Sequence, residues 1–160
     1  MVGNKCYFDI WNRYKWEQNI PKWVVLGNMK LNSKYKIGVL LKKNNIINAL
    51  IIGYIIFSDS ESGDSIILNS IEINPEYRNQ GYGSEILNWL KIYAPQYMKK
   101  RIELSIESHF NQATKFFIKN NFVPKMEPNY SFKNSTLSWE EFLIKNQCPS
   151  IIEFIYDTKQ

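Results

Sequence analysis

The chain has 160 residues, of which 44% are hydrophobic and 15% aromatic, and its formal net charge is +5. This length and apolar content suit a single domain over residues 1–160 and exclude a disordered chain. The longest apolar run, Ala49 to Phe57, is too short for a membrane-spanning helix of about 20 residues, and no signal peptide is visible. Cys6 and Cys148 form neither a metal spacing nor a disulfide framework, so we expect no metal and a cytoplasmic protein.

The first half of the chain predicts an antiparallel meander. Asn12 to Met29 is broken by Pro21 and predicts one or two short helices. Asn tolerates positive φ, so Asn44-Asn45 predicts a tight turn between two strands. Four apolar segments have the composition of strands, namely Cys6–Ile10, Lys36–Lys42, Ile46–Phe57 and Ile66–Ile73.

The second half alternates helices with strands. Glu85 to Ala94 carries one apolar stripe at helical spacing, and Pro95 is expected to end that helix. A second helix is expected within Asn111–Phe122 and a short one over Ser138–Lys145, with Glu141 placed for a capping box. The remaining strands are predicted at Arg101–Glu107, Phe122–Phe132 and Ile151–Tyr156, the second made irregular by two prolines.

The most informative segment is the turn from Asn74 to Ser84, which joins a predicted strand to a predicted helix. Its glycines, Gly81 and Gly83, let the backbone approach a ligand without a Cβ in between. Main-chain N–H groups at a helix start are unpaired, and together with the helix dipole they favour a bound phosphate.

This turn resembles the acetyl-CoA signature of the GNAT N-acetyltransferase superfamily. The residues that carry the likeness are Arg78-x-x-Gly81-x-Gly83 and the preceding Ile71-x-Ile73-x-Pro75-x-Tyr77. Asn111 to Phe122 is similar to the family's second signature, whereas P-loop and dinucleotide motifs fit worse. The resemblance implies an α+β, three-layer fold with a mixed sheet of six to seven strands and helices on both faces.

The resemblance also implies where acetyl-CoA binds. The strand ending at Ile73 is expected to splay from the strand of Ile102, and the pantetheine arm to lie in that gap beside the backbone of residues 71–73. The turn is expected to hold the diphosphate through its main-chain amides. The cofactor-binding residues are then Ile71, Ile73, Arg78, Asn79, Gln80, Gly81, Tyr82, Gly83, Ser84, Asn111 and Phe117.

The implied reaction passes an acetyl group directly to a primary amine. Asn69 and Ser105 stand where several family members carry a carboxylate or His, and Glu72 is the carboxylate nearest the turn. We therefore name Glu72, Asn69 and Ser105 as catalytic candidates, with Glu103 next. The family's frequent acid, a Tyr, is replaced by Phe117, which leaves Tyr82, Tyr130 or water as proton donors; His109 is interpreted as a capping or surface residue.

The acceptor must be neutral to attack. Deprotonating a lysine-like amine at pH 7 costs about 4.6 kcal/mol, but an α-amino group only about 1 kcal/mol, so a low-pKa amine is favoured. Two other functions stay open: a non-catalytic acetyl-CoA-binding module, and a toxin-like enzyme acting on RNA or aminoacyl-tRNA. The basic residues are scattered, which disfavours nucleic acid. A homodimer through the C-terminal strands is compatible with the sequence.

Overall fold

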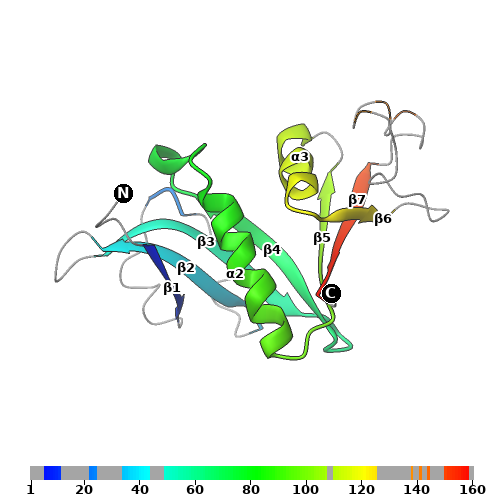
Figure 1. The fold of residues 1–160 in the computed structure, drawn as a ribbon, viewed down its shortest axis with the longest axis horizontal. Helices are drawn as coiled ribbons and strands as arrows, with labels where there is room; N and C mark the ends of the chain where they lie inside the picture. Colours follow the sequence, from blue (N-terminus) through cyan, green and yellow to red (C-terminus); the bar gives the residue numbers. More distant parts are fainter. Residues whose placement is uncertain are drawn as a thin grey trace.

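A computed structural model describes residues 6–11, 22–24, 34–43, 49–107, 110–125, 138, 141, 144 and 150–158. Seven strands form one mixed sheet in the order β1-β2-β3-β4-β5-β7-β6 (Figure 1). This sheet confirms the predicted α+β class and strand number. The elements are β1 (Cys6–Trp11), β2 (Lys36–Lys43), β3 (Ala49–Asp59), β4 (Ser65–Ile73), the 3₁₀ turn η2 (Pro75–Tyr77), α2 (Tyr82–Gln96), β5 (Arg101–Glu107), α3 (Asn111–Lys119), β6 (Val123–Lys125) and β7 (Ile151–Asp157).

Strands β4 and β5 diverge, and this divergence creates the central gap of the fold. β1, β2, β3 and β4 pair antiparallel in succession, and β2 to β4 form the three-stranded meander that the sequence predicted. β5 runs parallel to β4 but pairs with it only from Ser65↔Arg101 to Ile67↔Glu103. Beyond those pairs the strands share no ladder, as the resemblance implied. β7 then pairs with β5 on one side and β6 on the other.

A bulge interrupts β4 at Asn69. Leu68 pairs with Phe57 and Ser70 pairs with Ile56, so Asn69 has no cross-strand partner. One extra residue shifts the alternation of side chains between the two faces. Ile66 and Leu68 before the bulge, and Ile71 and Ile73 after it, therefore all belong to the same core cluster.

Helix α2 packs on the sheet through one buried stripe, which consists of Ile86, Leu87, Leu90 and Ala94. Figure 1 shows it lying across the sheet, with α3 above the β5 end. Two strand glycines make room for α2. A Cβ on Gly38 would lie 2.8 Å from Trp89 Cζ3, and one on Gly53 would lie 2.8 Å from Ile86 Cδ1.

The opposite face of the sheet has a second core cluster. Tyr54 and Ile56 of β3 are fully buried there beside Val24, with Trp23 packed against them. Trp23 and Val24 come from the segment predicted as short helices, so that segment supplies cover for this face. The rest of Asn12–Met29 lies outside the described residues.

The boundaries of α2 and β3 differ from the sequence predictions. α2 begins at Tyr82 rather than Glu85, because Gly81 takes the left-handed φ of +87° that starts the helix. Pro95 does not end it: proline removes one N–H in the last turn, and the helix continues to Gln96. β3 spans Ala49–Asp59 and so extends past its predicted end at Phe57, whereas residues 46–48 lie outside the described residues.

Several predictions near the chain's second signature and C-terminal region can be checked only in part. Asn121 takes a φ of +68° just after α3, as expected for an Asn at a helix end. The backbone N–H of Glu141 donates to Ser138 Oγ at 3.2 Å, as in the predicted cap. The Asn44-Asn45 turn, most of the Ser138–Lys145 helix, residues 126–132 of the predicted strand, His109, Tyr130 and Cys148 lie outside the described residues.

Candidate functional site

The turn before α2 leaves main-chain donors pointing outward. The first intrahelical hydrogen bond runs from Glu85 N to Gly81 O at 3.1 Å. The N–H groups of Tyr82, Gly83 and Ser84 come before it and have no intrahelical acceptor. Glu85 lies in the first turn, where a carboxylate complements the helix dipole, as predicted. This end of α2 therefore has the donors and the field that suit an anion.

Buried and main-chain contacts fix the turn to the sheet. Asn74 is buried; its N–H donates to Ile52 O at 2.7 Å, and its side-chain oxygen accepts from Glu76 N at 3.1 Å. Asn79 takes a φ of +62°, which Asn tolerates better than most residues. Arg78 Nε donates to Ile73 O at 3.3 Å. These contacts hold the turn in shape.

A cavity of about 650 Å³ lies beside this turn. It collects nine of the eleven predicted cofactor residues, which are Ile71, Ile73, Arg78, Asn79, Gly81, Tyr82, Gly83, Ser84 and Phe117. Gln80 is not among the lining residues; its side-chain amide donates to Glu76 O at 3.5 Å. α3 begins at Asn111 as expected, but the side chain of Asn111 lies outside what the structure describes.

Four other residues on α3 also line this cavity, and they were not predicted from the sequence. Gln112, Ala113, Phe116 and Lys119 line it at a helical spacing that could have been recognised once the helix was assigned. Phe116 comes closest to the turn: a Cβ added to Gly83 would lie 3.0 Å from two atoms of its ring. Gly83 is therefore needed for the close approach of α3 to α2.

A lysine fastens the two helices together behind the cavity. Lys91 of α2 donates to the backbone oxygen of Asn120 at the end of α3. Its ammonium also lies 4.5 Å from the centroid of the Tyr156 ring. Burial lowers the pKa of Lys91. The wall formed by α3 is thus held to α2 by a polar contact as well as by packing.

Tyr82 is the cavity tyrosine that the sequence offered as a proton donor. Burial raises the pKa of its hydroxyl, and the neighbouring Cys6 thiol and Glu85 carboxylate raise it further. The hydroxyl is hydrogen-bonded to Cys6 of β1, whose own pKa is also raised, chiefly by burial. Tyr82 therefore stays protonated, and its hydroxyl connects the helix start to the edge strand.

A second cavity of about 490 Å³ lies in the gap between β4 and β5. Its lining consists of Ile67, Leu68, Asn69, Glu103, Leu104, Ser105, Lys125, Glu153, Phe154 and Ile155. Asn69 and Ser105, two predicted catalytic residues, meet here with Glu103. Glu72 lines neither cavity; its carboxylate is exposed and lies 3.8 Å from the Arg78 guanidinium.

The Asn69 side chain has a defined orientation. Its Nδ2 donates to Ser58 Oγ at 3.0 Å and to the Ile67 backbone oxygen at 3.1 Å. A backbone oxygen can only accept, so the NH₂ group must face it. Both amide hydrogens are then used, and Oδ1 remains as a hydrogen-bond acceptor. Ser58 is buried, which holds the amide in place.

The two cavities open on opposite faces of the sheet. Ile71 and Ile73, in the first cavity, pack in the core beneath α2. Glu103 and Ser105, in the second, alternate with buried core residues of β5 and so point to the other face. β4 lines both cavities where its ladder with β5 has ended. A molecule that entered the gap from the α2 side would therefore meet a second molecule on the other side.

The comparisons with known proteins agree with this geometry. The model of the Acetyltransferase (GNAT) family matches residues 4–122, so the chain belongs to the GNAT acetyltransferase family. No curated protein matched the sequence.

Among solved structures, a GNAT family acetyltransferase from Elizabethkingia anophelis with acetyl-CoA bound is similar, with a TM-score of 0.66 and 16% identity over 95% of this chain and 97% of that one. An IAA acetyltransferase from Bacillus cereus has a TM-score of 0.64 and 11% identity, covering 96% and 99%. NAA60 of Arabidopsis thaliana, in complex with acetyl-CoA, has a TM-score of 0.60 and 12% identity, covering 96% and 98%.

The described residues include neither a membrane-spanning helix nor a cluster suited to a metal ion. No helix within the described ranges is both long and apolar enough to cross a membrane. In the same part of the chain, His, Cys, Asp and Glu side chains form no group of three that is suited to a metal ion.

Proposed function

We propose that the protein is an acetyl-CoA-dependent N-acetyltransferase that transfers an acetyl group directly to a primary amine. The observation that carries this proposal is the pair of cavities on opposite faces of the sheet, joined at the gap between β4 and β5. Membership of the acetyltransferase family supplies the class of reaction.

Acetyl-CoA is assigned to the cavity beside α2. The unpaired amides of Tyr82, Gly83 and Ser84 would hold the diphosphate, since hydrogen bonds to a charged group contribute about 1.5–3 kcal/mol each. Arg78 lines the same cavity and adds a positive charge. The pantetheine arm would run along the backbone of Ile71 and Ile73, which is free of ladder pairs to β5. The thioester then reaches the gap.

The amine acceptor is assigned to the other cavity. Asn69 Oδ1 accepts a hydrogen bond from the amine and so orients it, but an amide cannot take a proton from it. Glu103 and Glu153 are the carboxylates of this lining, and Glu103 shares it with Ser105. We infer that the amine loses its proton to Glu103, directly or through a water held by Ser105. The departing CoA thiolate takes its proton from solvent or Tyr82.

A second candidate is an acetyl-CoA-binding module without catalysis. It is favoured by one observation: Phe117 replaces the family's tyrosine and is 5% exposed, so this position supplies no proton. The two candidates share the cofactor cavity and differ on the acceptor side. Only the enzyme releases free thiol when an amine is added.

The test combines calorimetry with a thiol-release screen against polyamines, amino acids, aminoglycosides and peptides. Gly81→Glu is the key variant, because it places a carboxylate against the phosphates and a side chain at a φ of +87°. We expect acetyl-CoA affinity to fall by about a hundredfold or more. Ile92→Glu is the control for the added carboxylate, since Ile92 is 64% exposed on α2 and lines neither cavity.

Each result separates the candidates. Tight acetyl-CoA binding that Gly81→Glu abolishes and Ile92→Glu preserves, with thiol release for at least one amine, supports the enzyme. The same binding without thiol release for any amine supports the module. Equal affinity of the wild type and Gly81→Glu contradicts both.

A further inference from the structure

Strands β4 and β5 are paired only at their N-terminal ends, so contacts at these ends affect how far the two strands diverge. Their parallel ladder has three residue pairs, from Ser65↔Arg101 to Ile67↔Glu103. So short a ladder constrains the angle between two strands weakly. The angle therefore depends on the contacts that hold the starts of β4 and β5 together.

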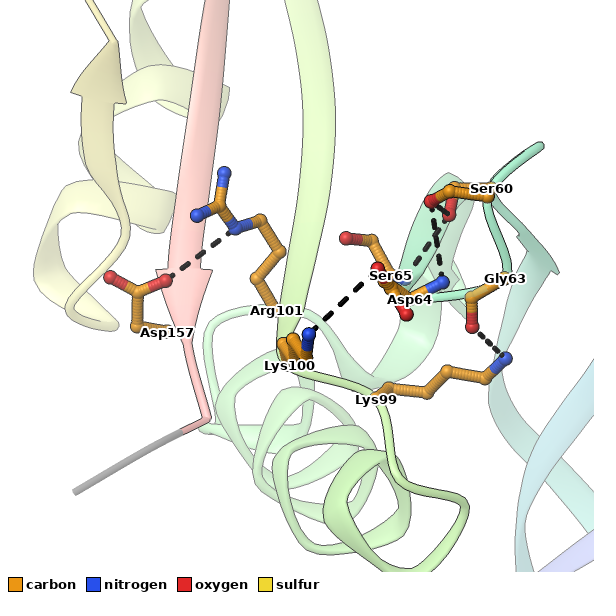
Figure 2. Close-up of polar contacts among 9 residues, drawn as sticks. Ser60, Gly63, Asp64, Ser65, Lys99, Lys100, Arg101 and Asp157 are labelled. Carbon is orange, nitrogen blue, oxygen red and sulfur yellow. Dashed lines mark hydrogen bonds and ion pairs between the residues drawn. The ribbon is translucent and has the colours of Figure 1, made fainter.

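Lys99, just before β5, makes the central contact at this end. Its side chain is 12% exposed, and its Nζ lies 3.2 Å from Asp59 Oδ1. The same Nζ donates to Gly63 O at 2.7 Å. The backbone N–H of Lys100 donates to Asp64 O at 2.7 Å. Figure 2 shows Lys99 and Lys100 reaching across to Gly63 and Asp64, so the segment that begins β5 is fastened to the turn that begins β4.

The same segment is also fastened to the end of β7. Thr158 donates from its backbone N–H to Lys100 O at 2.9 Å and from its hydroxyl to Lys99 O at 2.6 Å. Arg101 Nε lies 3.6 Å from Asp157 Oδ1 (Figure 2). The ends of β3 and β7, the turn before β4 and the start of β5 thus meet at Lys99 and Lys100. We call these contacts the closed-end network.

Within this network the two lysines differ. The Lys100 ammonium lies 3.9 Å from Asp64, and both side chains are about 60% exposed, so that pair contributes little. The Lys99 side chain is mostly buried, and its ammonium meets both a carbonyl and a carboxylate. Removing it breaks a charge-assisted hydrogen bond and an ion pair held by a packed side chain, which costs more than losing the exposed Lys100 pair.

We propose that Lys99 is a positioning residue that sets the opening of the gap between β4 and β5 and so the fit of the acyl-pantetheine arm. The inference rests on the proposed function, because it takes the gap as the path of that arm. Lys99 itself lines neither of the two cavities described above. Lys99 therefore acts indirectly, by setting the direction of β4 and β5. Its loss should weaken binding of the part of the cofactor that lies between these strands.

Two ligands distinguish this role from general stabilisation. Acetyl-CoA would occupy both the turn and the gap, whereas 3′,5′-ADP has the 3′-phosphate and only the first of the two 5′-phosphates, lacks the arm and would occupy only the turn. We expect Lys99→Met, which keeps the aliphatic stem, to weaken acetyl-CoA binding about tenfold, because small misplacements of a binding element are costly. Binding of 3′,5′-ADP should stay within about twofold. Lys100→Met is the matched control and should change neither affinity.

Calorimetry at a temperature where circular dichroism shows every variant folded gives the answer. Selective loss for acetyl-CoA, partly restored in Lys99→Arg, supports the proposal. Unchanged acetyl-CoA affinity, or an equal loss for both ligands, overturns it. If Lys99→Met does not fold, Asp59→Asn weakens the same contact from the end of β3 and must give the same selective loss. A wild type that binds 3′,5′-ADP but not acetyl-CoA contradicts the proposed function itself.

Discussion

The two cavities of this protein are built from different parts of the chain. The cavity beside α2 is formed around a local segment, the turn of residues 78–84, and presents main-chain amides from Tyr82 to Ser84. The cavity in the gap is formed by side chains from β4, β5, β6 and β7, among them Asn69, Glu103 and Lys125. A local, main-chain site can serve one constant ligand, while a site of dispersed side chains can change with each acceptor.

The difference predicts that the cavities can be disabled separately. A change at the turn should affect acetyl-CoA binding and spare the acceptor side. A change at Asn69 should slow transfer and spare acetyl-CoA binding. A variant that affected both equally would mean that the two cavities are not independent.

The largest effect in this comparison is expected from Gly83→Val. A Cβ at this position would lie 3.0 Å from the Phe116 ring, so the larger side chain pushes α3 away from the turn. Overpacking of this kind costs about 1–3 kcal/mol. Most of this cost should oppose the binding of acetyl-CoA. We therefore expect its Kd, measured by calorimetry, to rise about thirtyfold.

The same variant has an internal control. Gly83→Val combined with Phe116→Leu replaces the ring that causes the collision, so much of the lost affinity should return. If the double variant binds no better than Gly83→Val alone, the collision with Phe116 is not the cause.

A smaller effect, confined to the other cavity, is expected from Asn69→Leu. The leucine keeps the size of the side chain but removes the oxygen that would accept a hydrogen bond from the amine. Losing one such bond costs about 1–1.5 kcal/mol, which corresponds to about tenfold in kcat/KM for the acceptor. Ser70→Ala is the matched control: Ser70 is the next residue in β4, pairs with Ile56 and lines neither cavity. A rise in the Kd for acetyl-CoA in Asn69→Leu would contradict the separation.

The two cavities also differ in how far they could be predicted from the sequence. The turn was predictable because Gly81 and Pro75 act on their own neighbours in the chain. The strand register was not. The bulge at Asn69 left one trace, the spacing of Ile66, Leu68, Ile71 and Ile73, which departs from strict alternation by one residue.

The second cavity was predictable only in part. Asn69 and Ser105 were found by their places on two strands that the resemblance put side by side. Glu153 and Lys125 were not found, because β7 inserts between β5 and β6 and this order depends on tertiary packing. Pro95 shows the same limit on a smaller scale: the packing of α2 on the sheet overrides one unfavourable residue in its last turn.

The smallest expected effect is on the pH dependence of stability and comes from the titration of Tyr93. Tyr93 lines neither cavity, so it serves as a reference. Tyr93 lies in the second half of α2, where its ring stacks on Tyr97 with centroids 4.4 Å apart. Burial raises the pKa of the Tyr93 hydroxyl, and the nearby Tyr97 and Asp59 raise it further. The folded state therefore holds this proton more tightly than the unfolded chain does. The stabilising contribution is complete below the ordinary tyrosine pKa of about 10 and is lost as the pH rises through the raised value.

Tyr93→Phe removes this titration and keeps most of the ring packing. We expect the free energy of unfolding of the wild type, measured in urea from pH 8 to 11, to fall more steeply at the alkaline end than that of the variant. The lowered pKa of Lys91 acts in the opposite direction, but it is common to both proteins and cancels in the difference. Parallel curves would mean that the proton on Tyr93 is held equally in both states. The Kd for acetyl-CoA at pH 7.5 should be the same in both proteins, which separates the loss of scaffold stability from damage to either cavity.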